Sequence, residues 1–175
     1  MIKNETEFKM TVCNQEEENL FLDSLKPNHV VLEWGSGKST IAIAPLVKQV
    51  YSIENNKEWF DELKYIVPEN VSLNYVPANE EPTGGDDGTY QQFKDYVDFA
   101  ATLNRKFDII FIDGRARVAC AELAVKLLKK NGLLFVHDMR NPKIEYRRDE
   151  YEPIFDMFEL VDYEFTMYKF KPKKS

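Results

Sequence analysis

Residues 30–40 bring an apolar run, a glycine-rich loop and the start of an amphipathic segment together in direct succession. Val30–Glu33 predicts a buried strand, and the apolar spacing of Ser39–Val47 predicts a helix packed against it. Parallel strands need a crossover connection, which is usually a helix. This segment therefore predicts an α/β fold with a parallel sheet.

The rest of the chain repeats this alternation. A first helix is predicted at 14–25, with Asn14 capping its start together with Glu17 three residues later. Further strands are predicted at Gln49–Glu54, Val71–Val76, Phe107–Asp113 and Leu133–Val136, and further helices at Asn56–Ile66, Tyr90–Leu103, Val118–Lys130 and Glu150–Phe158. Leu160–Phe170 predicts two short closing strands that turn near Phe165. The pattern indicates a single-domain, Rossmann-like, doubly wound and mostly parallel sheet with an antiparallel closing strand.

One domain is expected to occupy residues 1–175, because a chain of this length buries one sizeable core and is short for two. Residues 1–13 are interpreted as an N-terminal extension and residues 171–175 as a basic tail. Residues 79–103 join an acidic, glycine-containing loop to a predicted helix. We interpret them as a candidate lid over a binding cleft, with another subunit as the alternative cover.

Composition narrows the classes of partner. A net charge of -7 argues against nucleic acid, which is bound largely by clustered Lys and Arg, and favours a neutral or cationic acceptor. No apolar run approaches the ~18 residues of a membrane span, and the polar start Met1–Lys9 is not typical of a signal peptide. We expect a cytoplasmic protein without a membrane partner; composition implies no particular oligomeric state.

The glycine-rich loop has two interpretations. Gly37-Lys38-Ser39 is similar to the end of a phosphate-binding P-loop, and Phe107–Asp113 would serve as the accompanying Walker B strand. That motif needs a glycine five positions before Gly37, where this chain has Leu32. A carboxylate at Glu33 would also lie beside phosphates that the loop should attract. The register Glu-x-Gly-x-Gly over residues 33–37 fits a nucleoside-binding loop without a mismatch.

Four predicted strands end in ionisable residues: Glu33, Glu54, Asp113 and the pair His137-Asp138. In open parallel sheets, ligands bind outside the carboxyl ends of the strands, so these groups indicate a site. Glu54 lies 21 residues after Glu33, which is about the interval at which an acid reaches a ribose hydroxyl. In the alternative interpretation, Glu54 only caps the helix near Asn56, and Glu33 is a buried acid satisfied by backbone donors.

These segments resemble class I S-adenosylmethionine-dependent methyltransferases over roughly residues 14–170. The matching segments are Leu-Glu-Trp-Gly-Ser-Gly at 32–37, Tyr-Ser-Ile-Glu at 51–54, Phe-Ile-Asp-Gly-Arg-Ala-Arg-Val-Ala-Cys-Ala at 111–121 and Gly-Leu-Leu-Phe-Val-His-Asp at 132–138. The third is the most specific, and it is similar to a subgroup of small methyltransferases of which some are associated with glycans.

The resemblance implies S-adenosyl-L-methionine as the cofactor. The residues implied to bind it are Glu33, Trp34, Gly35, Gly37, Ser39, Glu54, Asn55, Ala78, Asn79 and Asp113. Among them, Glu33 and the two glycines would surround the methionine part, Glu54 would bind the ribose, and Ala78 and Asn79 would border the adenine. Many members of the family have an acid directly after the third strand, whereas this chain has Pro77-Ala78-Asn79.

Asp113, His137 and Asp138 are the candidate catalytic residues, because a hydroxyl acceptor must lose its proton. Their positions resemble those of metal-dependent O-methyltransferases, which implies a divalent cation, Mg or Mn, held by the same three residues. A metal-free general base, His137 or Asp113, is an equal alternative. In a purely structural alternative, Asp113 hydrogen-bonds Arg115 or the next loop while His137-Asp138 caps the turn into Met139. Arg115 and Arg117 either pair with Asp113, which is the more frequent arrangement, or orient a substrate carboxylate.

The sequence therefore predicts a methyltransferase that acts on the oxygen of a small polar acceptor, with a sugar or glycan hydroxyl as the leading candidate. Two other functions stay open. One is a P-loop phosphotransferase or NTPase, and the other is a non-catalytic module that keeps the cofactor fold for partner binding.

Overall fold

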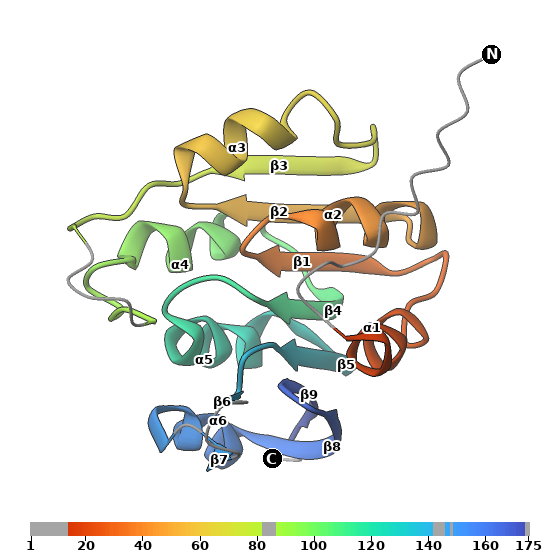
Figure 1. Ribbon diagram of the computed structural model, residues 1–175, viewed down its shortest axis with the longest axis vertical. Helices are drawn as coiled ribbons and strands as arrows, with labels where there is room; N and C mark the ends of the chain where they lie inside the picture. The colour runs from red at the N-terminus through yellow and green to blue at the C-terminus, as the bar shows by residue number, and fades with distance from the viewer. Residues whose placement is uncertain (1–13, 82–86, 142–145, 148, 174–175) are drawn as a thin grey trace.

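The computed structural model describes residues 14–81, 87–141, 146–147 and 149–173 (Figure 1). The strands are β1 (Val30–Trp34), β2 (Gln49–Glu54), β3 (Val71–Tyr75), β4 (Phe107–Ile112), β5 (Leu128–Val136), β8 (Phe158–Glu164) and β9 (Met167–Pro172), and they form one sheet in the order β3-β2-β1-β4-β5-β9-β8. The first five strands pair in parallel, and β9 is antiparallel to both of its neighbours. This topology confirms the predicted Rossmann-like fold.

Helices cover both faces of the sheet. They are α1 (Gln15–Leu22), α2 (Lys38–Ile43) with the 3-10 turn η1 (Ala44–Leu46), α3 (Lys57–Leu63), α4 (Lys94–Thr102), α5 (Arg117–Leu127), the 3-10 turn η2 (Asp149–Tyr151) and α6 (Glu152–Met157). A separate two-stranded ribbon joins β6 (Arg140–Asn141) to β7 (Tyr146–Arg147). No helix of the described ranges has the length and apolar character needed to cross a membrane.

Two cores form because successive side chains of a strand point to opposite faces of the sheet. On β1, Leu32 and Trp34 join the core that is closed by α4, α5 and α6, whereas Val31 joins the core beneath α1 and α2. On the second face, the ring of Phe21 from α1 stacks on Phe111 at 4.5 Å between centroids. This alternation decides to which face each residue at a strand end points.

Most element boundaries agree with the sequence prediction, and the exceptions have local causes. The predicted helix Ser39–Val47 stops at Ile43, because Pro45 lacks the N–H that would continue an α-helix. The predicted helix Val118–Lys130 is present as α5, but its predicted end is wrong. The helix ends at Leu127, and Leu128 pairs with Phe107, so Gly132 lies inside β5 where its register with β4 shifts.

Parts of three predicted segments lie outside the described residues: the N-terminal extension 1–13, residues 82–86 of the candidate lid, and the end of the basic tail. Hydrogen bonds hold the described parts of the lid segment on both sides of residues 82–86. Asn79 accepts the N–H of Asp95 at 2.8 Å through its side chain, and the carbonyl of Asp87 accepts the N–H of Ala116 at 2.8 Å.

Candidate functional site

The order of the strands reverses between β1 and β4, and the loops that follow these two strands touch each other. Gly35 has a φ of +93°, and a Cβ atom there would lie 2.6 Å from the Cα of Gly114. A glycine is therefore required at position 35 by the fold itself. At Gly37, by contrast, an added Cβ would meet no described atom within 4 Å. The space in front of Gly37 is thus open to a ligand.

Glu54, at the end of β2, organises the same loop. Its carboxylate accepts the backbone N–H of Ser36 at 2.7 Å and the backbone N–H of Asn56 at 2.6 Å. Burial raises the pKa of Glu54, against these hydrogen bonds. The helix-capping role goes instead to Asn56, whose side chain accepts the N–H of Trp59 at 3.0 Å. The backbone N–H of Asn55 is a third hydrogen-bond donor to this carboxylate, so one of its roughly four lone-pair sites is left for a ligand.

Glu33 lies on the opposite face of β1 from Trp34 and is fully buried. Its carboxylate accepts hydrogen bonds from the hydroxyls of Thr40 and Ser52, each at 2.5 Å, and from the hydroxyl of Ser39. Burial raises the pKa of Glu33 to about 7, although these hydroxyls lower it. Side-chain hydroxyls, rather than the backbone donors that the sequence suggested, satisfy this acid.

The side chains of two other residues that were predicted to bind the cofactor also point into the protein interior. Trp34 is fully buried, and its indole N–H donates to the carbonyl of Tyr96 at 3.2 Å. Ser39 is buried, and its hydroxyl donates a hydrogen bond to Glu33. Contacts of Trp34 with a ligand are consequently confined to its main chain.

The loops enclose a polar pocket of about 360 Å³, which is within the usual range for small-ligand sites. It is lined by Gly35, Ser36, Glu54, Asn55, Asn56, Trp59, Asp113, Gly114, Arg115, Arg117 and Asp138. A second pocket of about 580 Å³ shares Asn55 and Asn56 with the first and reaches the predicted adenine residues Ala78 and Asn79. The structure thus brings residues from the ends of the five parallel strands β1 to β5 around two adjacent pockets.

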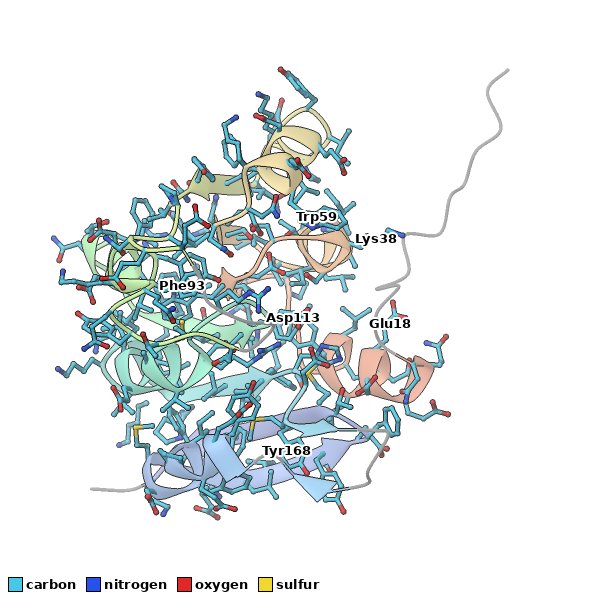
Figure 2. All side chains as sticks on the ribbon, turned by 60° about the vertical axis from the view of Figure 1, so that its left-hand side comes forward. Glu18, Lys38, Trp59, Phe93, Asp113 and Tyr168 are labelled. Atoms are coloured by element: carbon cyan, nitrogen blue, oxygen red, sulfur yellow. The ribbon has the colours of Figure 1, made fainter. Side chains whose placement is uncertain are left out.

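Trp59 is the main lining residue that the sequence did not identify. Its position next to Phe60 in a helical pattern suggested a core residue, but its side chain is 49% exposed and lines the first pocket. The missed signal is that adjacent helical residues point in directions about 100° apart, so both seldom face the core. Lys38 projects outward from the start of α2 (Figure 2) and is exposed.

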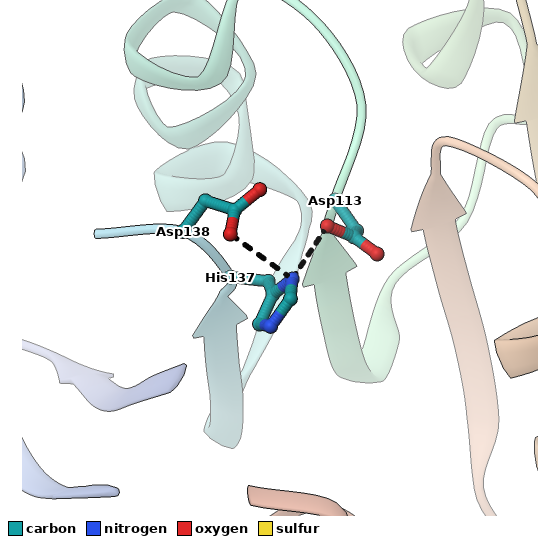
Figure 3. A group of neighbouring side chains, drawn as sticks. All are labelled: Asp113, His137 and Asp138. Carbon is teal, nitrogen blue, oxygen red and sulfur yellow. Dashed lines mark hydrogen bonds and ion pairs between the residues drawn. The ribbon is translucent and has the colours of Figure 1, made fainter. Parts of the chain in front are cut away.

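Asp113, His137 and Asp138 come together at the ends of β4 and β5 (Figure 3). Nδ1 of His137 lies 2.9 Å from Oδ1 of Asp113 and 3.7 Å from Oδ1 of Asp138. One potential ligand atom from each of the three lies within 4.8 Å of the others. Asp138 has a φ of 59°, a conformation that Asp tolerates better than most residues, and this turn directs its carboxylate back toward the strand end.

Arg117 holds Asp138 from the other side. One guanidinium nitrogen donates to Asp138 at 3.1 Å, and the other donates to Asp87 at 2.6 Å and to the hydroxyl of Tyr151 at 3.2 Å. The closest approach of Arg117 to Asp113 is 4.0 Å. The predicted pairing of Arg117 is therefore present, but its main partners are Asp87 and Asp138.

Glu17 completes this cluster from beneath and was expected only to cap the first helix. The expected capping box with Asn14 is present, and Oε1 of Glu17 also lies 3.8 Å from Nε2 of His137. Burial would raise the pKa of Glu17, but the nearby imidazole of His137 and hydrogen bonds from Thr166 and Asn14 lower it to about 2. Glu17 is therefore an ionised carboxylate in the interior.

The glycine-rich loop at residues 35–37 does not have the geometry of a phosphate-binding loop. The backbone N–H groups of Gly35, Ser36 and Gly37 donate to the carbonyl of Ile53, the carboxylate of Glu54 and the hydroxyl of Thr40, respectively. In a P-loop, such N–H groups point at the phosphates. The geometry therefore argues against the phosphotransferase interpretation.

Comparison with known proteins gives a consistent result. Residues 32–139 match a family model described as a methyltransferase domain. No curated protein matches the chain closely enough to count as a relative. A methyltransferase-like protein from Silicibacter pomeroyi is similar in structure, with 23% identity, a TM-score of 0.70, and coverage of 94% of this chain and 88% of that one.

Two further solved structures share the fold at lower identity. The N-methyltransferase NodS from Bradyrhizobium japonicum has 13% identity and a TM-score of 0.58, covering 98% of this chain and 100% of that one. A precorrin 8w decarboxylase from Methanobacterium thermoautotrophicum has 18% identity and a TM-score of 0.56, covering 92% of this chain and 76% of that one. These two proteins are named for different activities, so the shared fold does not identify an acceptor.

Proposed function

The chain belongs to the family of methyltransferase domains, and on that premise we propose that it is an S-adenosylmethionine-dependent O-methyltransferase acting on a sugar, a glycan or another small polar acceptor. One observation supports an oxygen atom as the acceptor of the methyl group. Asp113 and Asp138 line the same pocket as Gly35 and Glu54, and His137 lies between the two aspartates. Groups that can take a proton therefore stand at the edge of the cofactor pocket.

The two pockets support a division of the cofactor site into parts for the ribose, the methionine and the adenine. In the proposal, Glu54 accepts a ribose hydroxyl with its remaining lone pair, and the opening before Gly37 admits the methionine part. Asn55, Ala78 and Asn79 border the adenine from the second pocket. The indole of Trp59 forms an apolar wall of an otherwise polar site.

Methyl transfer from a sulfonium is a displacement that depends on alignment, and a hydroxyl acceptor must also lose its proton. Asp113 is well placed to accept this proton because its side chain is partly exposed at the pocket and is held by His137. His137 is 1% exposed, so it acts on the acceptor through Asp113 unless the site opens. Asp113 is thus the favoured base in a metal-free mechanism.

A divalent cation fits the cluster. The carboxylates of Asp87, Asp113 and Asp138 lie within 4.0 Å of the guanidinium of Arg117, and the carboxylate of Glu17 lies 3.8 Å from His137. Two carboxylates with one imidazole suit Mg or Mn. In the proposal Asp113, His137 and Asp138 hold the cation. Such an ion, when bound, lowers the pKa of the acceptor hydroxyl.

The cofactor proposal is tested by calorimetric titration with S-adenosylmethionine and S-adenosylhomocysteine. We expect binding by the wild type, at least tenfold weaker binding by Glu54→Ala, and wild-type binding by Glu62→Ala, whose exposed side chain lies on α3 away from the pocket lining. No binding by a folded wild-type protein at millimolar ligand would reject the proposal.

The acceptor and metal proposals are tested by transfer of a labelled methyl group to a panel of sugars, glycans and small alcohols. Product is expected on a hydroxyl, and both EDTA and Asp138→Ala are expected to lower turnover at least tenfold. Full activity in EDTA together with full activity of Asp138→Ala would reject the cation. Cofactor binding without product on any acceptor would instead favour the non-catalytic module.

A further inference from the structure

A cavity of about 500 Å³ lies across Arg117 from the cofactor pocket. Its described walls come from residues 87–92, from the start of α5 and from η2, and its volume is usual for a small-ligand site. We propose that this cavity holds the methyl acceptor and selects sugar-sized hydroxyl compounds that carry no acidic group. The inference rests on the proposed function, because a compound bound there is an acceptor only if the neighbouring pocket holds the methyl donor.

The guanidinium of Arg117 separates the cavity from the cofactor pocket. Its Nη1 donates to Asp87 at 2.6 Å and to the hydroxyl of Tyr151 at 3.2 Å, and both of these residues line the cavity. Its Nη2 donates at 3.1 Å to Asp138, which lines the cofactor pocket. A single planar group therefore spans the distance between the two spaces. In the proposal, the acceptor presents its hydroxyl past this group toward Asp138.

The wall at Asp87 is fixed by the start of α5. The carbonyl of Asp87 accepts the N–H of Ala116 at 2.8 Å, and its carboxylate accepts the backbone N–H of Arg117 at 2.7 Å. Ala116 has a φ of 51°, which residues other than glycine seldom adopt, and it turns the chain from the cofactor loop into α5. The start of a helix attracts anions, but here a carboxylate of the protein already occupies that position.

The other walls combine apolar surface with a few polar groups. Tyr90 lines the cavity with a side chain that is 38% exposed, and its hydroxyl donates to Asp98 at 2.9 Å. The side-chain carbonyl of Gln92 accepts the N–H of Thr89 at 2.9 Å, which fixes the orientation of the amide and of its two N–H donors. Ala119 adds apolar surface from α5. Such a mixture is typical of sites that bind small polar molecules.

The charge of the lining gives the selectivity. Every charged residue in the described lining is acidic, namely Asp87, Glu122 and Glu150. Burial raises the pKa of Asp87, and the nearby charge of Glu150 adds to this against the effect of Arg117. Carboxylates accept hydrogen bonds from hydroxyl and ammonium groups, whereas they repel a second carboxylate or a phosphate. The cavity therefore suits a neutral or an amine-bearing sugar and disfavours a sugar acid.

Three hexoses that differ in charge test the cavity directly: neutral D-glucose, cationic D-glucosamine and anionic D-glucuronate. Each is titrated to high millimolar concentration into 15N-labelled protein at mildly acidic pH, with and without S-adenosylhomocysteine, and the backbone amide shifts are followed by NMR. We expect D-glucose and D-glucosamine to shift the amide signals of Gly88 and Ala119, which line the cavity. D-glucuronate is expected to bind at least tenfold more weakly than D-glucosamine.

Three variants locate the binding. Ala119→Trp fills the cavity without changing its charge, so it is expected to weaken hexose binding at least tenfold and to keep the binding of S-adenosylhomocysteine. Val125→Trp places the same side chain on α5 at a position that is 43% exposed and outside the lining, so it is expected to bind like the wild type. Glu122→Lys changes only an exposed side chain and is expected to weaken D-glucosamine and strengthen D-glucuronate.

The outcomes separate this inference from the proposed function. Binding of S-adenosylhomocysteine without a shift by any hexose overturns the inference and leaves the methyltransferase proposal standing. D-glucuronate binding as tightly as D-glucosamine overturns the charge selection, and unchanged hexose binding in folded Ala119→Trp overturns the location. Hexose shifts at the cavity in a protein that does not bind S-adenosylhomocysteine reject the proposed function, and with it the role of the cavity as an acceptor site.

Discussion

Replacing Glu33 by glutamine should remove a pH-dependent loss of stability. Glu33 is fully buried, and burial raises its pKa from an ordinary 4.5 to about 7. Between these two values the folded state holds a proton that the unfolded state has released. The free energy of unfolding therefore falls as the pH rises, by about 1.4 kcal/mol per pH unit from this group.

Over the whole interval from pH 4.5 to pH 7, the free energy of unfolding falls by about 3 kcal/mol. The loss is absent below pH 4.5 and complete above pH 7. A glutamine of the same shape carries no charge at any pH. Its carbonyl can accept protons from the hydroxyls that surround position 33, and its amide can donate to their oxygens. The variant should therefore match the wild type at pH 4.5 and exceed it in stability near pH 8.

Urea unfolding of the ligand-free protein at several pH values measures this difference. Subtracting the wild type from Glu33→Gln at each pH cancels the titration of all other groups, as long as the m-values agree. Glu62→Gln, at an exposed position, should give a difference near zero throughout. A difference for Glu33→Gln that is flat with pH, or that grows toward acid pH, would refute the reasoning.

Two further contrasts test the pocket. Gly35→Ala should lower the free energy of unfolding in urea by about 2 to 5 kcal/mol, because position 35 has a positive φ and a Cβ would lie 2.6 Å from Gly114. Gly37→Ala should instead fold with wild-type stability and bind S-adenosylhomocysteine at least tenfold more weakly. Equal stability of the two variants would contradict this. Titration with S-adenosylhomocysteine should change the fluorescence of the half-exposed Trp59 and leave the fluorescence of the buried Trp34 unchanged. The Trp59→Phe variant should therefore lose the response. A response that persists in Trp59→Phe would place this side chain away from the ligand.

Strand ends were predictable because they depend on local patterns. The continuous apolar run of Phe107–Asp113 identified a central parallel strand, and β4 is Phe107–Ile112. Gln49–Glu54 was predicted with the bounds that β2 has. The end of α5 was missed because Leu127 and Leu128 fit a helix and a strand equally well, and the pairing of Leu128 with Phe107 decides between them.

The roles of the acids were less predictable. Glu33 and Glu54 look alike in the sequence, since each ends an apolar strand. The structure separates them: Glu54 binds the loop N–H groups at the pocket, whereas Glu33 is enclosed by hydroxyls under α2. The difference arises from which helix covers each side chain, and a local pattern does not contain that information.

The sequence by itself determined the alternating α/β order, the glycine loop, and the presence of Glu54, Asp113, His137 and Asp138 at one edge of the sheet. These follow from hydrophobic periodicity and from the rule that parallel strands share their carboxyl edge. Only the tertiary structure placed Glu17 beneath His137. A contact across 120 positions of chain depends on how α1 packs on β5, and that packing is set by the whole core rather than by neighbouring residues.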